Sequence, residues 1–228
     1  MRSQLDAIFI GQQVQKNGFW LIQIELSQYS VLGVGTRFLY QDHQAWLFQK
    51  QTLYLTLLSQ TDWRGLQPNQ SFNLEVMPYP FNFDPQTSQV WLGSELSQAS
   101  VFDAAKRWQQ SLKPKAPMMA LLHAQHDFMF QAKPAKFLVN INAEAIGAAP
   151  LLEDWGIANR LASDSGLPGS LEGGIADLYQ AWLQAYHQQA WSVYGFLPDP
   201  QYQACLKLSQ AYPNINFQLQ PILTNTLN

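Results

Sequence analysis

Short apolar runs separated by polar turns make up the first part of the chain, and no helical period lies between them. Runs of this kind, rich in β-branched and aromatic residues, predict strands. The expected strands are residues 7–10, 19–26, 37–40, 45–48, 53–58 and 72–76. Asn17-Gly18 is the strongest hairpin signal, because both residue types tolerate a positive φ. Strands at this regular spacing predict an antiparallel β-barrel.

The hydrophobic period changes after a polar, proline-containing stretch at residues 84–88. Beyond it, strand-like runs alternate with helical stripes. The expected strands are residues 90–92, 118–122, 137–141, 159–162, 191–194 and 217–219, and the expected helices include residues 101–108, 175–186 and a segment opening at 199. Such alternation predicts a parallel sheet covered on both faces. We therefore expect an antiparallel barrel in residues 1–86 and an α/β domain of nucleotide-binding type in residues 87–228.

Composition then narrows the classes of function. The chain has 228 residues, of which 47% are hydrophobic and only 13% charged, with 13 Lys+Arg against 16 Asp+Glu. Nucleic-acid binding needs clustered basic residues, so we do not expect it. No apolar run reaches the roughly 18 residues of a membrane span, and the N-terminus lacks a signal-peptide pattern, which predicts a cytoplasmic protein without membrane association. The single cysteine, Cys205, excludes an internal disulfide and is expected in the core.

Ligands of an open parallel sheet bind at the carboxyl ends of its strands, which here are three strand–turn–helix junctions. The residues of interest at these junctions are Gly93, Ser94, Leu96, Gly169, Glu172, Gly173, Gly195, Phe196 and Pro198. The first junction can hold a phosphate on free backbone N–H groups. It has one glycine where binding loops usually have several, and Glu95 would repel an anion. An ordinary βα turn is the favoured interpretation of that segment alone.

The other two junctions keep alternatives open. The loop at residues 162–174 has four glycines and several acidic residues, which suits a binding loop. A connector whose Ser and Asp side chains satisfy backbone groups explains it equally well. At residues 194–200 the alternative is plain turn chemistry, with Asp199 as a helix cap.

His123 and His126 are separated by three positions, but no third ligand stands at a recognisable spacing. We expect surface or turn histidines there and no metal. The sequence has no Gly-x-Ser-x-Gly elbow, no phosphate-binding Walker loop and no nucleophile with a base beside it.

A barrel followed by a nucleotide-type domain resembles the ferredoxin–NADP reductase superfamily. Residues 90–96, 149–163, 169–183 and 193–200 are similar to dihydroorotate dehydrogenase electron-transfer subunits, and the likeness covers residues 88–220. The resemblance implies FAD between the domains and NAD(P)H held near Gly93, Gly195 and Pro198. It also implies a redox or regulatory protein partner.

Several positions depart from that family's pattern. The Arg-x-Tyr-Ser motif that holds the flavin is absent, and residues 45–58 offer only Lys50 as a cation. Ser97 and Gln98 stand where the family has glycines. Phe196 and Leu197 replace a Cys-Gly pair, and Phe196 fills space that a nicotinamide ring needs. The family's cysteine-bearing tail has no counterpart, so no iron–sulfur cluster is expected.

Two hypotheses on function follow. In the first, the chain is a flavin- and NAD(P)H-dependent electron-transfer oxidoreductase, whose cofactors do the redox chemistry. In the second, it is a degenerate, non-catalytic member that acts as a binding or partner-docking protein. The family likeness favours the first and the lost motifs favour the second. Fold alone does not decide between them, and the sequence leaves the oligomeric state open.

Overall fold

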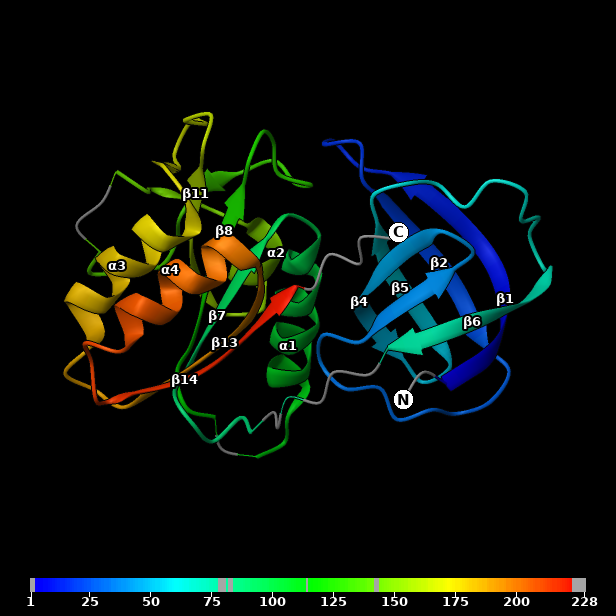
Figure 1. Ribbon diagram of the computed structural model, residues 1–228, viewed down its shortest axis with the longest axis horizontal. Coiled ribbons are helices and arrows are strands. Elements are labelled where there is room, and N and C mark those ends of the chain that lie inside the picture. Colours follow the sequence, from blue (N-terminus) through cyan, green and yellow to red (C-terminus); the bar gives the residue numbers. More distant parts are fainter. Residues whose placement is uncertain (1–2, 78–80, 82–83, 114, 142–143, 223–228) are drawn as a thin grey trace.

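The structure is a computed structural model that describes residues 3–77, 81, 84–113, 115–141 and 144–222. It has two parts, a β-barrel and an α/β domain, which lie side by side in Figure 1. This arrangement confirms the fold class predicted from the hydrophobic pattern. The predicted domain boundary, between residues 86 and 87, falls in the connection between the last barrel strand and the first strand of the second sheet.

The barrel closes from six antiparallel strands in the order β1-β2-β5-β4-β3-β6. The strands are β1 (Ser3–Val14), β2 (Trp20–Leu26), β3 (Arg37–Tyr40), β4 (His43–Gln51), β5 (Tyr54–Ser59) and β6 (Ser71–Met77). Along β2, Ile22 and Ile24 are fully buried whereas Gln23 between them is exposed. This period of two gives the barrel its apolar interior. The Asn17-Gly18 turn joins β1 and β2 as predicted, with φ of +81° at Gly18.

The α/β domain is built on a six-stranded parallel sheet in the order β12-β11-β8-β7-β13-β14. Its strands are β7 (Gln89–Ser94), β8 (Met118–Ala124), β11 (Ala158–Ser163), β12 (Leu171–Glu172), β13 (Trp191–Pro198) and β14 (Ile215–Ile222). Every residue of β7 and β8 is buried. Such full burial is typical of a parallel sheet with helices on both faces.

Among the described residues, four α-helices cover the sheet, two on each face (Figure 1). On the barrel side lie α1 (Gln98–Gln110) and α2 (Pro150–Asp154), and on the far side lie α3 (Ile175–Tyr186) and α4 (Asp199–Ser209). A 3-10 turn, η1 (Glu95–Ser97), precedes α1, and β9 (Lys133–Pro134) pairs with β10 (Gly147–Ala148). In the described residues, no helix is both long and apolar enough to cross a membrane.

One predicted strand is wrong. Residues 137–141 form an irregular segment, and Leu138 is exposed. The segment is held by its backbone, because Arg160 Nη2 donates to the Phe137 carbonyl oxygen and the Asn140 N–H donates to the Tyr186 hydroxyl. The edge of the sheet beyond β11 is taken by β12 instead. A short apolar run does not by itself distinguish a strand from a loop with one buried side.

The two domains share a hydrophobic core. Trp46 and Phe48 on the outer face of β4 belong to the same buried cluster as Val101 and Phe102 of α1 and Phe196 of β13. Burial of this apolar surface stabilises the barrel against the α/β domain. The cofactor site implied by the family resemblance would lie at this contact between the domains.

Candidate functional site

Phe196 lies at the centre of the contact between the domains. Its side chain is 1% exposed, although it sits near the carboxyl end of β13, where ligands of such sheets bind. The centre of its ring lies 5.1 Å from that of Trp46 in the barrel and 4.8 Å from that of Phe81. The aromatic ring thus occupies the space that the family resemblance assigns to a nicotinamide ring.

The barrel backbone is shaped to accept this ring. Gly35 has φ of +80°, and a Cβ built on it would come within 1.9 Å of Phe196 Cε2. Real atoms do not approach so closely, so any side chain at position 35 would have to displace the ring. The absence of a Cβ lets the Phe196 ring rest directly on the backbone.

Further rings surround this contact and close it. Trp91 and Tyr194 stack at 4.9 Å between ring centres, and Phe48 lies 5.0 Å from Phe102. Arg37 is also enclosed, with its guanidinium 5.4 Å from the centre of the Trp46 ring. These side chains are packed against one another and do not fit a flavin ring between the domains. A flavin could enter only by displacing them.

At the first junction, after β7, packing and hydrogen bonds within the protein engage the polar groups that could otherwise bind a ligand. A Cβ on Gly93 would lie 2.8 Å from the Gln98 Cα, so the glycine allows α1 to pack closely on the strand. The Ser94 N–H donates to Ser97 Oγ at 2.9 Å, and Gln98 Nε2 donates to the His123 carbonyl oxygen at 2.8 Å. Leu96 is partly buried against the shared core. The contacts favour the ordinary βα turn over a phosphate cradle.

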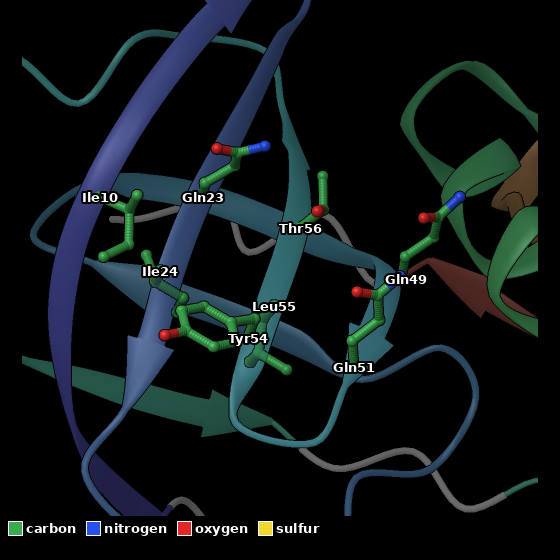
Figure 2. A pocket seen from close by; sticks show the side chains of 8 residues that line it. All are labelled: Ile10, Gln23, Ile24, Gln49, Gln51, Tyr54, Leu55 and Thr56. Atoms are coloured by element: carbon green, nitrogen blue, oxygen red, sulfur yellow. The ribbon is translucent and has the colours of Figure 1, made fainter.

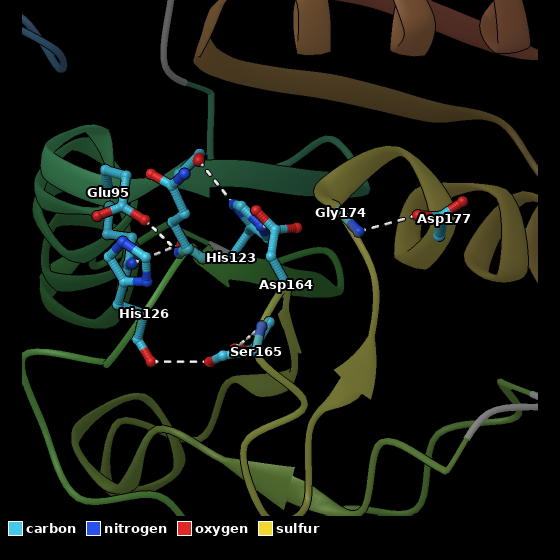
Figure 3. Close-up of polar contacts among 11 residues, drawn as sticks. Glu95, His123, His126, Asp164, Ser165, Gly174 and Asp177 are labelled. Atoms are coloured by element: carbon cyan, nitrogen blue, oxygen red, sulfur yellow. Dashed lines mark hydrogen bonds and ion pairs between the residues drawn. The ribbon is translucent and has the colours of Figure 1, made fainter.

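Glu95 adds a negative charge to the same turn. Its φ of +52° is unusual for a residue with a side chain. Its carboxylate accepts a hydrogen bond from the Gln125 N–H and so bridges the ends of β7 and β8 (Figure 3). A carboxylate in this position would repel an anionic ligand.

A chain of polar side chains that sequence reasoning missed runs across three strand ends (Figure 3). Ser94 Oγ lies 2.8 Å from His123 Nδ1, and His123 Nε2 lies 3.0 Å from Asp164 Oδ1. The prediction of a surface or turn histidine is wrong for His123, which is 1% exposed within β8. The expectation of no nucleophile beside a base is also wrong, because β7, β8 and β11 are neighbours in the sheet and bring these residues together.

Burial limits what this Ser–His–Asp chain can do. A catalytic triad presents its serine to the substrate and an oxyanion site beside it. Ser94 is 1% exposed, whereas the Asp164 side chain is 47% exposed. The accessible end is therefore the carboxylate and not the hydroxyl. The arrangement satisfies buried polar groups and ties the three strands together. Among the described residues, no three potential ligands converge as a metal ion would require.

The second junction, after β11, is an ordered loop. Gly169 has φ of +81°, and its carbonyl oxygen accepts a 2.7 Å hydrogen bond from the Gly147 N–H. Gly173 has φ of +134°, and Asp177 Oδ2 caps the next helix by accepting from the Gly174 N–H at 2.8 Å. Glu172 is exposed. Backbone geometry explains these two glycines without a ligand.

The third junction, at the end of β13, also has a packing explanation. A Cβ on Gly195 would lie 2.1 Å from the Leu92 carbonyl oxygen of the neighbouring strand. Pro198 is the residue before α4, and no side chain caps that helix. The predicted capping role of Asp199 is therefore wrong: it is the first helical residue, where its charge suits the helix dipole.

A polar groove lies elsewhere, on the outside of the barrel (Figure 2). It encloses about 360 Å³ and spans β1, β2, β4 and β5. Its lining residues are Ile10, Gln23, Ile24, Gln49, Gln51, Tyr54, Leu55 and Thr56. None of these side chains carries a charge, so the groove offers amide and hydroxyl groups but no cation for a diphosphate.

Neither a protein-family model nor a curated protein sequence matches this chain. Solved structures share its fold. The chain is similar to the Amycolatopsis cytochrome P450 reductase GcoB, with a TM-score of 0.67 and 12% identity over 97% of this chain and 71% of that one. It is similar to the ferredoxin reductase in carbazole 1,9a-dioxygenase, with a TM-score of 0.65 and 9% identity over 96% and 69% of the two chains.

The CS-b5R domains of human Ncb5or, in their NAD+ form, are a third similar structure, with a TM-score of 0.65 and 9% identity over 96% of this chain and 70% of that one. At such identities the likeness establishes the two-domain fold of ferredoxin–NADP reductase-like proteins. Activity has to be argued from the residues.

Proposed function

We propose that this chain is a non-catalytic member of the reductase-like fold, which binds a ligand or a protein partner without holding a flavin between its domains. The observation that carries the proposal is the contact of Phe196 with Gly35 and Trp46. Phe196 lies where the resemblance implies a nicotinamide ring, and Trp46 packs with Phe48 and Phe102 in the interdomain core where the resemblance implies FAD. The enclosed Arg37 and the uncharged barrel groove support it, because neither offers an accessible cation to a diphosphate.

A second candidate is the flavin- and NAD(P)H-dependent electron-transfer oxidoreductase, related to dihydroorotate dehydrogenase electron-transfer subunits and served by a redox partner. The shared fold and the ordered loop after β11, with the half-exposed Asp164, favour it. In that case a cofactor would have to displace Phe196 from the barrel.

The absorption spectrum of the purified protein separates the two candidates. The protein is incubated with excess FAD and desalted, and the visible flavin bands of the protein fraction are measured. We expect a colourless protein and all of the flavin in the small-molecule fraction. Stoichiometric retention of flavin, bleached by NADH or NADPH, would establish the oxidoreductase instead. A Phe196→Gly variant run in parallel tests whether the ring alone excludes the flavin.

A further inference from the structure

A second pocket, with a different lining, lies between the barrel and α1. It encloses about 250 Å³. Three segments form it: the loop before β3, the turn between β4 and β5, and the second half of α1. Its lining residues are Tyr29, Val31, Leu32, Lys50, Thr52, Asp103, Lys106, Arg107 and Gln110. We call it the cationic pocket, because three of these side chains are basic and one is acidic.

The acidic residue is already neutralised by one of the basic ones. Arg107 Nε donates to Asp103 Oδ1 at 3.0 Å, and its Nη2 lies 3.0 Å from Oδ2. The same Nη2 also donates to the Leu32 carbonyl oxygen of the barrel loop. Asp103 is buried beneath this ion pair. The Arg107–Asp103 pair is therefore a fixed, nearly neutral wall of the cationic pocket.

The two lysines are left with neutral partners. Lys50 Nζ donates to the Ser30 carbonyl oxygen and lies 4.3 Å from the centre of the Tyr29 ring. Lys106 Nζ donates to Gln109 Oε1 at 2.9 Å and lies 5.0 Å from the centre of the Trp155 ring. Within the part of the chain that the structure describes, neither ammonium group forms an ion pair. The cationic pocket thus carries two uncompensated positive charges in a protein whose net charge is −3.

The two lysines that line the cationic pocket come from different domains. Lys50 comes from β4 of the barrel and Lys106 from α1 of the α/β domain. Burial lowers the pKa of Lys50 and the positive charge of Arg107 lowers it further, whereas the Asp103 carboxylate raises it. Concentrating cations in a partly desolvated place costs free energy, and a bound anion would recover it.

We propose that the cationic pocket binds a small anion, carrying a phosphate or carboxylate group, through the two lysines that line it, Lys50 and Lys106. Tyr29 and the 87% exposed Val31 form an apolar rim for the rest of the molecule. The volume lies below the roughly 300–1,000 Å³ of most small-molecule sites, which favours a small metabolite over a dinucleotide. The cationic pocket includes neither Trp46 nor Phe196, so the inference stands whether or not the chain holds a flavin.

Phosphate binding to the full chain tests the proposal. Inorganic phosphate is titrated at constant ionic strength and pH and followed by the broadening of its ³¹P resonance. Lys50→Gln and Lys106→Gln are compared with Lys207→Gln, a matched removal of an exposed lysine on α4. We expect saturable binding to the wild type, a dissociation constant raised about tenfold in each pocket variant, and no change in the control. Circular dichroism verifies that each variant is folded.

Competition by citrate distinguishes the two sources of negative charge. Displacement of phosphate by citrate would show that carboxylates are accepted, and failure to displace it would make the site selective for phosphate; both outcomes support an anion site. Non-saturable broadening would overturn the proposal. Equal loss of binding in all three variants, which indicates general electrostatic attraction, would overturn it as well.

Discussion

The Phe196 ring rests on the backbone of Gly35, at the place where a side chain on residue 35 would otherwise be. A Cβ there would lie 1.9 Å from Phe196 Cε2 and 2.2 Å from Cζ. The two residues are far apart in the sequence and belong to different domains, so the contact fixes one domain against the other. The residue types at the two positions depend on each other, because the large Phe196 ring fits only where residue 35 has no side chain.

We expect Gly35→Ala to destabilise the protein by about 2–4 kcal/mol, through overpacking against Phe196 and the cost of a positive φ. Phe196→Ala should cost about 3–5 kcal/mol by leaving a cavity. The double variant should lose less than the sum of the two, by about 1–3 kcal/mol, because the clash disappears with the ring. Urea unfolding of the four proteins measures this coupling.

Gly65→Ala is the matched control for the cost of placing alanine at a positive φ. Gly65 has φ of +93° with no atom within 4 Å of a built Cβ, so about 1 kcal/mol of strain is expected without a clash. Strict additivity of the Gly35 and Phe196 substitutions would contradict the contact between the domains.

The second prediction concerns Gly195, where β13 approaches β7 closely. Its φ is +149°, and a Cβ would lie 2.1 Å from the Leu92 carbonyl oxygen. We expect Gly195→Ala to cost more than about 4 kcal/mol, since both the backbone conformation and the strand pairing must change. Gly11→Ala in β1 is the control, because nothing lies within 4 Å of its Cβ position. An unchanged thermal midpoint for Gly195→Ala would refute the packing explanation of this glycine.

Much of the architecture could be predicted from the sequence, because it depends on local patterns. The period of two in Ile22-Gln23-Ile24 and the Asn17-Gly18 turn are readable without a structure. The change of period near residue 84 likewise separates barrel from α/β domain. Cys205, expected in the core, is buried there.

The site could not be predicted in the same way, because it depends on which strands are neighbours. Ser94, His123 and Asp164 stand 29 and 41 positions apart and meet only because β7, β8 and β11 are adjacent. A histidine near the end of a strand buried on both faces was the one available signal, since it requires polar partners there. The Gly35–Phe196 contact leaves no local signal of any kind.

The buried polar chain gives the third prediction. Ser94→Ala removes the hydroxyl beside His123 Nδ1 and leaves a buried nitrogen without that partner. We expect a loss of about 1–3 kcal/mol in the free energy of unfolding. Ser27→Ala, on an exposed residue after β2, should change it by less than about 0.5 kcal/mol. If both variants unfold at the same urea concentration, the Ser94–His123 hydrogen bond contributes nothing to stability.

The last prediction concerns the pH dependence of stability at Asp103. Burial raises the pKa of this carboxyl from 3.8 to about 6, although Arg107 beside it acts in the opposite direction. The folded state therefore holds a proton more tightly than the unfolded state does. The resulting stability is fully present below about pH 4 and is lost as the pH rises through about 6, by on the order of 3 kcal/mol.

Asp103→Asn removes this titration, so the stability difference between wild type and variant is the quantity to follow. The free energy of unfolding of the wild type should fall relative to that of the variant between pH 4 and 6.5. The difference should stay constant at higher pH, because the carboxyl is then ionised in both the folded and the unfolded state. Urea unfolding at a series of pH values measures it, and Asp42→Asn, in the exposed turn between β3 and β4, controls for the loss of a carboxylate. A stability difference that moves in favour of the wild type as the pH rises would mean that the pairing with Arg107 outweighs burial, and that the carboxyl in the wall of the cationic pocket is ionised throughout this range.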